Sequence, residues 1–259
     1  MFNSRLNLMI SDFKDHFSHI AASYAAFRPM QPPAVIAWAA SLPQRHDVAW
    51  DCGTGNGQAA RGLAEYFTTV IATDASATQI AHATPHSNVQ YRVAPAEASG
   101  LDAHTVDLVT VAQALHWFDV ERFYNEAKRV IVPGGALAIW GYGDARSDEP
   151  AVDRVLREFT RGTVGPYWPP ERRILDSGFR TIPFPFREVT PPEFTLEERW
   201  TLNELLGYLR TWSATAAYIA ANGRDPVEES TAAFETAWGN GSVQRVIRWP
   251  VAVRAGYVG

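Results

Sequence analysis

The stretch VAWDCGTGNGQAARGLAEY, residues 48–66, decides the fold. A short apolar run leads into a loop with glycine at every second position, and the loop leads into a helical pattern. Gly53, Gly55 and Gly57 allow positive φ, and without a Cβ the backbone can approach a ligand closely. The free N–H groups at the start of the helix favour an anionic or strongly polar group. The stretch therefore predicts a strand, a ligand-binding loop and a helix.

Short apolar runs and helical patterns keep alternating from residue 32 to about residue 140. Strands separated by helices of about ten residues are typical of right-handed crossovers, and they indicate an α/β fold with a mostly parallel sheet covered by helices on both faces. Helices are expected at 33–42, 58–67, 76–84 and 119–131, and strands at 47–52, 70–74, 89–94, 106–113 and 135–143. Ligands of such sheets bind beyond the carboxyl ends of the strands.

The rhythm changes after residue 144. Residues 152–159 and 195–221 have helical patterns, whereas residues 184–196 and 246–258 read as two late strands that join the sheet antiparallel to each other. We therefore expect seven strands, with a core in residues 1–145. Residues 146–259 are expected to form a C-terminal helical cap together with the last two strands, and both parts are expected to make one structural domain.

Composition narrows the class of protein. The chain has 259 residues, 46% of them hydrophobic, and a net charge of −5, which argues against binding to nucleic acid or to an anionic membrane and favours a small-molecule partner. The single cysteine, Cys52, suits a reducing cytoplasm, and no apolar run reaches the roughly 20 residues that cross a bilayer. No metal site is expected, nine tryptophans hint at an aromatic-lined pocket, and the oligomeric state stays open.

The glycine loop does not match the two common phosphate loops. A dinucleotide fingerprint needs a third glycine where this chain has Gln58, and a P-loop needs a lysine that is absent. Asp51 at the end of the first strand repels phosphate and attracts an ammonium group. Asp74 ends the second strand, where a carboxylate can accept hydrogen bonds from both hydroxyls of a ribose. A ligand with an amine and a ribose fits better than a nicotinamide cofactor.

These residues resemble the class I S-adenosylmethionine-dependent methyltransferases. The ordered motifs are DCGTGNG at 51–57, TDAS at 73–76, APAEAS at 94–99, VAQALHWFD at 111–119 and RVIVPGGALAIW at 129–140. DHFSHIAASYAAFRP at 15–29, YWPPER at 167–172 and LLGYLRTWSA at 205–214 are similar to a subgroup that includes trans-aconitate methyltransferases. The resemblance implies a Rossmann-like fold, S-adenosylmethionine as cofactor and S-adenosylhomocysteine as product.

The resemblance also implies roles for residues of the core. Two groups are expected to bind the methionine part of the cofactor: Asp51, Gly53, Thr54, Gly55 and Gln113 from the sheet, and Tyr24 with Arg28 from a covering N-terminal helix. Asp74 is expected to hold the ribose. The adenine is expected to contact Ala75, Ala96 and Glu97.

The acceptor side is expected around His116. This histidine is a candidate general base, or else it only lines the site, because methyl transfer from a sulfonium depends mainly on positioning. Trp117, Trp168, Arg172 and Trp212 are expected to bind the acceptor. The expected reaction is an in-line SN2 methylation of a small organic acceptor, most readily on oxygen, with a carboxylate as one option. The alternative is a non-catalytic module that binds S-adenosylmethionine.

Overall fold

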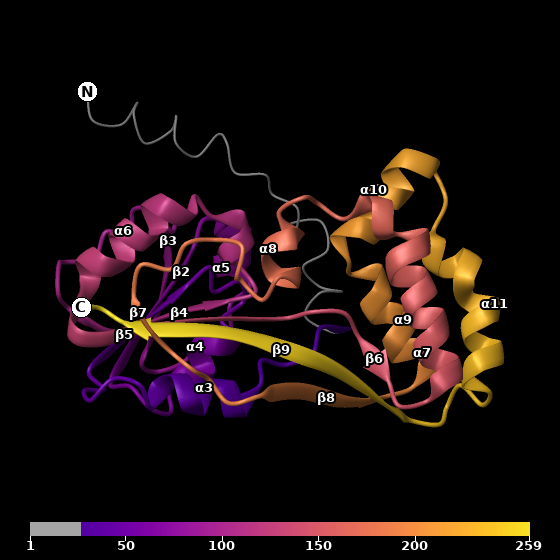
Figure 1. Cartoon of the computed structure of the whole chain (residues 1–259), viewed down its shortest axis with the longest axis horizontal. Coiled ribbons are helices and arrows are strands. Elements are labelled where there is room, and N and C mark those ends of the chain that lie inside the picture. Colours follow the sequence, from indigo (N-terminus) through magenta and orange to yellow (C-terminus); the bar gives the residue numbers. More distant parts are fainter. Residues whose placement is uncertain (1–26) are drawn as a thin grey trace.

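A single mixed sheet organises the computed structural model, which describes residues 27–259 (Figure 1). Within these residues it has nine strands: β1 (Val48–Cys52), β2 (Thr69–Asp74), β3 (Val89–Val93), β4 (Val106–Ala112), β5 (Ile131–Tyr142), β6 (Arg146–Ser147), β7 (Arg187–Val189), β8 (Phe194–Trp200) and β9 (Arg245–Tyr257).

The strand order explains where ligands meet the sheet. The main path is β3-β2-β1-β4-β5-β9; the first five strands are parallel and β9 is antiparallel to β5. The short β7 and the longer β8 both pair antiparallel with β9 and share the edge position beyond it, while the two-residue β6 pairs with the start of β9. The expected Rossmann-like sheet with seven strand positions is confirmed, and the carboxyl ends of β1 to β4 lie along one edge.

Helices cover both faces of the sheet. On one face α3 (Pro33–Ala40) and α4 (Gln58–Leu63) pack against small and branched strand residues. On the other face lie α6 (Val120–Val130) and the short α8 (Arg172–Asp176), against an aromatic and aliphatic layer. The small α5 (Ala77–Ala81) follows β2. No helix among residues 27–259 is long and apolar enough to pass through a bilayer.

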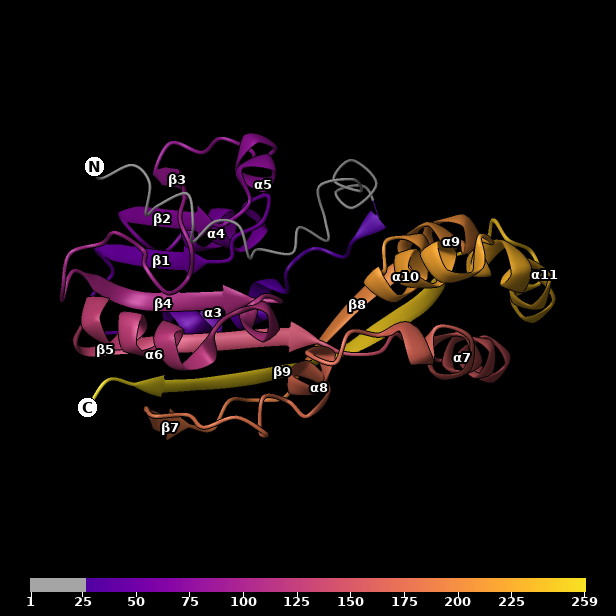
Figure 2. The same cartoon turned by 90° about the horizontal axis from the view of Figure 1, so that it is seen from above.

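The cap is a separate helical layer at one end of the sheet (Figures 1 and 2). It contains α7 (Pro150–Arg157), which continues into a π-helical turn at Glu158–Thr163, and then α9 (Leu202–Arg210), α10 (Ser213–Asn222) and α11 (Pro226–Trp238). These helices share a core with the cap ends of β8 and β9, in which Trp238 and Trp249 are fully buried. The last two long strands therefore run from the sheet into the cap.

One predicted helix is wrong at its start. Residues 195–200 belong to β8, not to the helix expected at 195–221, because Leu196 and Trp200 alternate with exposed Glu197 and Arg199 and pair with β9. The helix begins only at Leu202, where Thr201 and Glu204 form a capping box.

The strand expected at 184–196 is also interrupted. It divides into β7 and β8 around Pro191 and Pro192, which have no N–H to donate to a neighbouring strand.

Candidate functional site

The glycine loop between β1 and α4 has the backbone geometry that its glycines permit. Gly53, Gly55 and Gly57 have φ of +69°, +58° and +85°. A Cβ on Gly53 would lie 2.6 Å from the Ala114 Cβ, whereas among residues 27–259 a Cβ on Gly55 would meet only a Gln79 oxygen at 3.9 Å. Packing within the protein thus requires glycine at position 53. The space beside Gly55 is not filled by described side chains and is open to a ligand.

Asp51 lies beneath this loop and is fully buried. Its two carboxylate oxygens accept hydrogen bonds from Thr54 Oγ1 at 2.6 Å and Thr110 Oγ1 at 2.8 Å. Burial raises the pKa of Asp51 to about 6, against the opposing effect of these hydroxyls. The Asp51 carboxylate therefore holds Thr54 in place and connects the glycine loop to β4.

Asp74 connects the tip of the loop to the end of β2. Its carboxylate accepts hydrogen bonds from the backbone N–H groups of Gly55 and Ser76, both at 2.9 Å. Ser76 in turn caps α5, and Ala75 lies half-buried between them. A carboxylate oxygen can accept more than one hydrogen bond, so holding the loop is compatible with holding a ribose.

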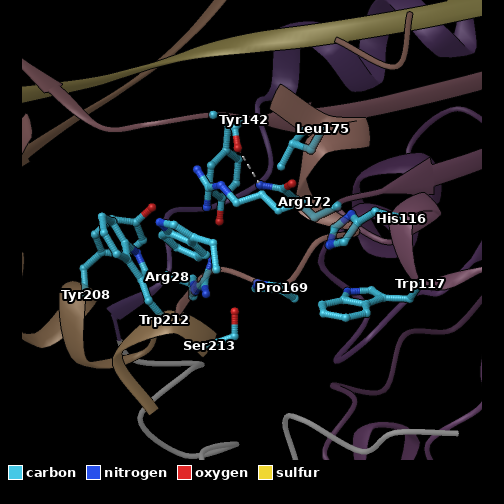
Figure 3. Close-up of a pocket in the computed structure, with 13 residues that line it drawn as sticks. Arg28, His116, Trp117, Tyr142, Pro169, Arg172, Leu175, Tyr208, Trp212 and Ser213 are labelled. Carbon is cyan, nitrogen blue, oxygen red and sulfur yellow. Dashed lines mark hydrogen bonds between the residues drawn. The ribbon is translucent and has the colours of Figure 1, made fainter. Parts of the chain in front are cut away.

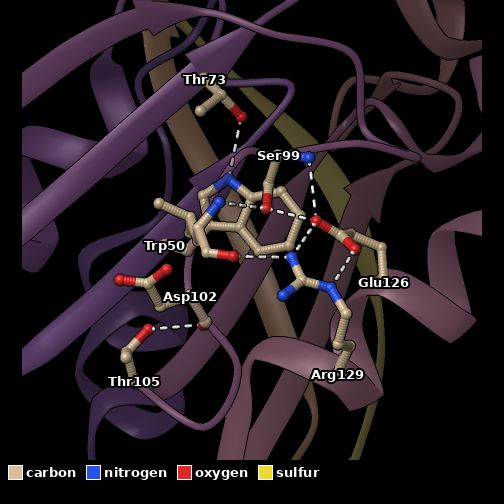
Figure 4. A network of polar contacts seen from close by, with 8 residues as sticks. Trp50, Thr73, Ser99, Asp102, Thr105, Glu126 and Arg129 are labelled. Atoms are coloured by element: carbon tan, nitrogen blue, oxygen red, sulfur yellow. Dashed lines mark hydrogen bonds and ion pairs between the residues drawn. The ribbon is translucent and has the colours of Figure 1, made fainter.

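The loop after β3 is tied to α6 by a buried carboxylate (Figure 4). Glu126 accepts hydrogen bonds from the N–H and the hydroxyl of Ser99, and it forms an ion pair with Arg129. In the same loop Ala96 is buried, and Glu97 accepts a hydrogen bond of 2.8 Å from the backbone N–H of Asp119. Two of the three residues expected at the adenine are thus held near β1 and α6: Ala96 shares a buried cluster with Cys52 of β1, and Glu97 is bonded to the start of α6.

Gln113 has the most unusual backbone at this edge. It follows β4 with φ of +57°, a left-handed conformation that costs energy for a residue other than glycine. Its N–H donates to the Trp140 carbonyl at 2.9 Å and its Nε2 to the Tyr142 carbonyl at 3.3 Å. The strained turn carries the chain from β4 to His116.

A pocket lies between this edge and the cap (Figure 3). It brings together seven residues singled out from the sequence: Arg28, Gln113, His116, Trp117, Trp168, Arg172 and Trp212. The sequence did not point to six others: Tyr142, Gly143, Pro169, Leu175, Tyr208 and Ser213. Two of the residues expected at the cofactor, Arg28 and Gln113, therefore meet the five expected at the acceptor around one cavity, while the other described cofactor candidates lie outside it.

Arg28 contacts the cap. Its Nη2 donates to the Thr211 carbonyl at 3.2 Å, and its guanidinium lies 5.5 Å from the centre of the Tyr208 ring. The Tyr208 hydroxyl accepts a hydrogen bond from Trp249 Nε1 at 3.0 Å, so this ring is fixed from behind. Tyr24, the other residue expected to cover the cofactor, lies outside the described residues.

Arg172 forms the opposite wall of the pocket. Its guanidinium lies 3.7 Å from the centre of the Trp168 ring and pairs with Asp144 and Asp176. Trp168 is itself held, because its Nε1 donates to the Thr160 carbonyl in the π-helical turn. Rigid aromatic and guanidinium groups thus face the cavity.

His116 is half-buried and packs against Trp117, with ring centres 4.7 Å apart. Burial and, to a lesser degree, the charge of Arg172 lower the pKa of His116 to about 4. Its Nδ1 is buried and has no hydrogen-bond partner among the described residues. The imidazole is therefore neutral at pH 7 and can exchange a hydrogen bond with a bound molecule.

Weak signals marked some of the residues that were missed. Tyr208 stands in the quoted phrase LLGYLRTWSA. Tyr142 ends the fifth strand and Asp144 lies just beyond it, where ligands of such sheets bind. Only the packing of the cap against the sheet singles them out from the other tyrosines and aspartates.

The residues at the sheet edge fit S-adenosylmethionine. An open space stands above a positive-φ glycine, a carboxylate ends β2, and Gln113 turns in a strained conformation toward the pocket. The described residues contain no group of three His, Cys, Asp or Glu side chains that could hold a metal ion.

Comparisons with known proteins agree with this assignment. A family model described as a methyltransferase domain matches residues 50–139. A Dictyostelium discoideum protein described as a methyltransferase is 37% identical over 220 residues, which are 84% of this chain and 84% of that protein.

Solved structures show the same relationship. One described as a type II methyltransferase from Anaeromyxobacter dehalogenans is 44% identical, with a TM-score of 0.84 over 90% of this chain and 98% of that chain. A methyltransferase structure from Anabaena variabilis, 18% identical with a TM-score of 0.53 over 85% of this chain and 98% of that one, shares the fold. With its ordered motifs, its sheet and this similarity, the chain belongs to the class I S-adenosylmethionine-dependent methyltransferases.

Proposed function

We propose that this methyltransferase methylates an oxygen of a small acidic acceptor, most readily a carboxylate, held in the pocket between the sheet and the cap. The observation that carries the proposal is the composition of this pocket. Gln113 from the cofactor side shares it with two guanidinium groups, those of Arg28 and Arg172, and with the aromatic walls of Trp168 and Trp212. Guanidinium groups bind carboxylates well, and aromatic walls exclude water.

The side chains of the pocket have separate tasks in this proposal. S-adenosylmethionine supplies a methyl group on a sulfonium, which is already a good leaving group. We assign Arg28, expected from the sequence to bind the methionine part of the cofactor, to the acceptor instead, because it lines the same pocket as Arg172. The two guanidinium groups orient the acceptor anion, and the tryptophans hold its apolar part. Such positioning is the main source of rate in an in-line displacement, because the reacting atoms are held close and aligned.

The low pKa of His116 favours a carboxylate over an alcohol. A base with a pKa of about 4 removes a proton from an alcohol poorly, although it can still hold an oxygen by a hydrogen bond. A carboxylate acceptor is ionised at neutral pH and needs no base. We therefore assign His116 a positioning role next to the acceptor oxygen.

The looser resemblance to trans-aconitate methyltransferases supports the same class of acceptor. The phrases at 167–172 and 205–214 that carry it supply Trp168, Arg172 and Trp212 of the pocket. A cavity beside Gln113 also leaves room for an acceptor, which a non-catalytic module would not need.

The test is a panel of acceptors assayed with methyl-labelled S-adenosylmethionine. The panel contains benzoate, phenylacetate and succinate, then phenol and catechol, and finally benzylamine. We expect transfer to at least one carboxylate, lost on alkaline hydrolysis of the ester, and a KM for it raised about tenfold or more in Arg172→Gln. Arg210→Gln, in a cap arginine that pairs with Asp225 outside the pocket, is the matched control. Transfer to the amine or phenols alone would refute the proposal.

A further inference from the structure

The guanidinium of Arg172 is held by three neighbours. Its Nη2 donates to Asp144 Oδ1 at 2.7 Å, its Nε donates to Asp176 Oδ1 at 3.1 Å, and its Cζ lies 3.7 Å from the centre of the Trp168 ring. Only 15% of its side chain is exposed. Its Nη1 makes no hydrogen bond to any residue in the described part of the chain, so this end of the group is the one available to an acceptor.

Asp144 and Asp176 differ in how strongly they can hold the Arg172 guanidinium in place. Asp176 is 51% exposed and lies four residues after Arg172 on the same short helix, a type of pair that contributes little. Asp144 is 23% exposed, makes the shorter contact and comes from a different element, the chain just after β5. Arg161 approaches its second oxygen at 3.7 Å. Asp144 therefore sets where Arg172 stands relative to the sheet.

The end of β5 also holds the cofactor side. The carbonyl of Tyr142, two residues before Asp144, accepts the hydrogen bond from Gln113 Nε2. Arg172 and Gln113 line the same pocket, and both are held by hydrogen bonds to residues 142–144.

We propose that Asp144 is a positioning residue for the methyl acceptor: it holds the Arg172 guanidinium over the Trp168 ring at the wall of the pocket. The proposal rests on the acidic acceptor proposed above. Asp144 acts through Arg172 and does not itself touch the acceptor.

The kinetic test is a double-mutant cycle of Asp144→Asn and Arg172→Gln, with the carboxylate of the panel that has the highest kcat/KM as acceptor. We expect each single variant to raise the acceptor KM about tenfold, with kcat changed less than about threefold, and the double variant to be no worse than Arg172→Gln alone. Asp144→Glu should recover part of the loss. Affinity for S-adenosylhomocysteine, measured by calorimetry, should stay within about twofold, and Asp153→Asn, which breaks an ion pair with Arg157 outside the pocket, should change neither value.

The outcomes separate this inference from the proposed function. If Arg172→Gln raises KM and Asp144→Asn does not, or if their effects multiply, the positioning role is wrong and the acidic acceptor stands. If neither variant changes KM, Arg172 does not bind the acceptor and the positioning role of Asp144 fails, while transfer to the carboxylate still supports the acidic acceptor. The proposed function fails only if no carboxylate in the panel is methylated.

A crystal structure of Asp144→Asn with S-adenosylhomocysteine decides the point even without an acceptor. In Asp144→Asn the Arg172 guanidinium should move away from the Trp168 ring. In Asp176→Asn it should stay over that ring. An unmoved guanidinium in Asp144→Asn would overturn the inference.

Discussion

Among single residues, His116 has a pKa that folding lowers, and this makes the stability of the protein depend on pH. In the unfolded chain its pKa is near 6.5, whereas burial beside Arg172 lowers it to about 4 in the folded protein. Between these two values the unfolded chain binds a proton that the folded protein does not. The stability due to His116 is therefore complete above about pH 6.5 and is lost as the pH falls toward 4.

We predict that His116→Gln makes the protein less sensitive to mild acid. The loss of unfolding free energy from pH 7 to pH 4.5 should be smaller in the variant, by up to about 2.4 kcal/mol for a shift of this size. Urea denaturation at each pH measures it. Asp51 acts in the opposite direction, because its raised pKa of about 6 adds stability as the pH falls, but its effect cancels in the comparison. Equal acid sensitivity in both proteins would show that His116 is not buried as a neutral group.

Among the structural elements, the glycine loop allows the effect of a glycine on stability to be separated from its effect on cofactor binding. Gly55 and Gly223 both have positive φ, and within the described part of the chain neither would bring an added Cβ closer than 3.9 Å to another atom. Gly55 lies in the loop after β1, while Gly223 caps α10 in the cap. The two positions form a matched pair.

We predict that Gly55→Ala and Gly223→Ala each cost about 1–2 kcal/mol of unfolding free energy, the ordinary cost of a left-handed residue with a side chain. Only Gly55→Ala should weaken S-adenosylhomocysteine binding, by about tenfold or more, because its methyl group would enter the space where we expect the cofactor to bind. Calorimetric titration and urea denaturation measure the two effects. Equal affinities in both variants would mean that the cofactor does not pass over Gly55.

The elements also show what periodicity can reveal. The parallel strands are short apolar runs with helices between them, and their order on the chain fixes which strand ends meet, so Asp74 and Gln113 could be placed at one edge from the sequence. Residues 195–200 could not be assigned in the same way. Their alternation is short and merges with the helix from Leu202, and only pairing with β9 makes them a strand. Asp144 and Tyr208 matter through contacts across the cap, which no local pattern encodes.

At the scale of the whole molecule, two continuous strands join the cap to the sheet (Figure 2). β9 pairs with β5 through its second half and with β8 through its first half, where Trp249 enters the core of the cap. The cap core cannot separate from the sheet without breaking this ladder. The pocket lies where the two parts meet, so its shape depends on both.

This continuity predicts that cap and sheet unfold as one unit. S-adenosylhomocysteine at a hundred times its dissociation constant should add about 2.7 kcal/mol to the unfolding free energy of the whole protein. Native-state hydrogen exchange followed by mass spectrometry can read this separately in peptides from β1 and β4 and in peptides from α9 and α11, since the slowest amides exchange only on global unfolding. We expect the slowest amides of both groups to be slowed by the same factor, about a hundredfold, which is that free energy converted to a rate ratio. Protection that rises only in the sheet peptides would show that the cap opens on its own, and that the acceptor wall formed by Trp212 and Tyr208 is assembled separately from the cofactor site.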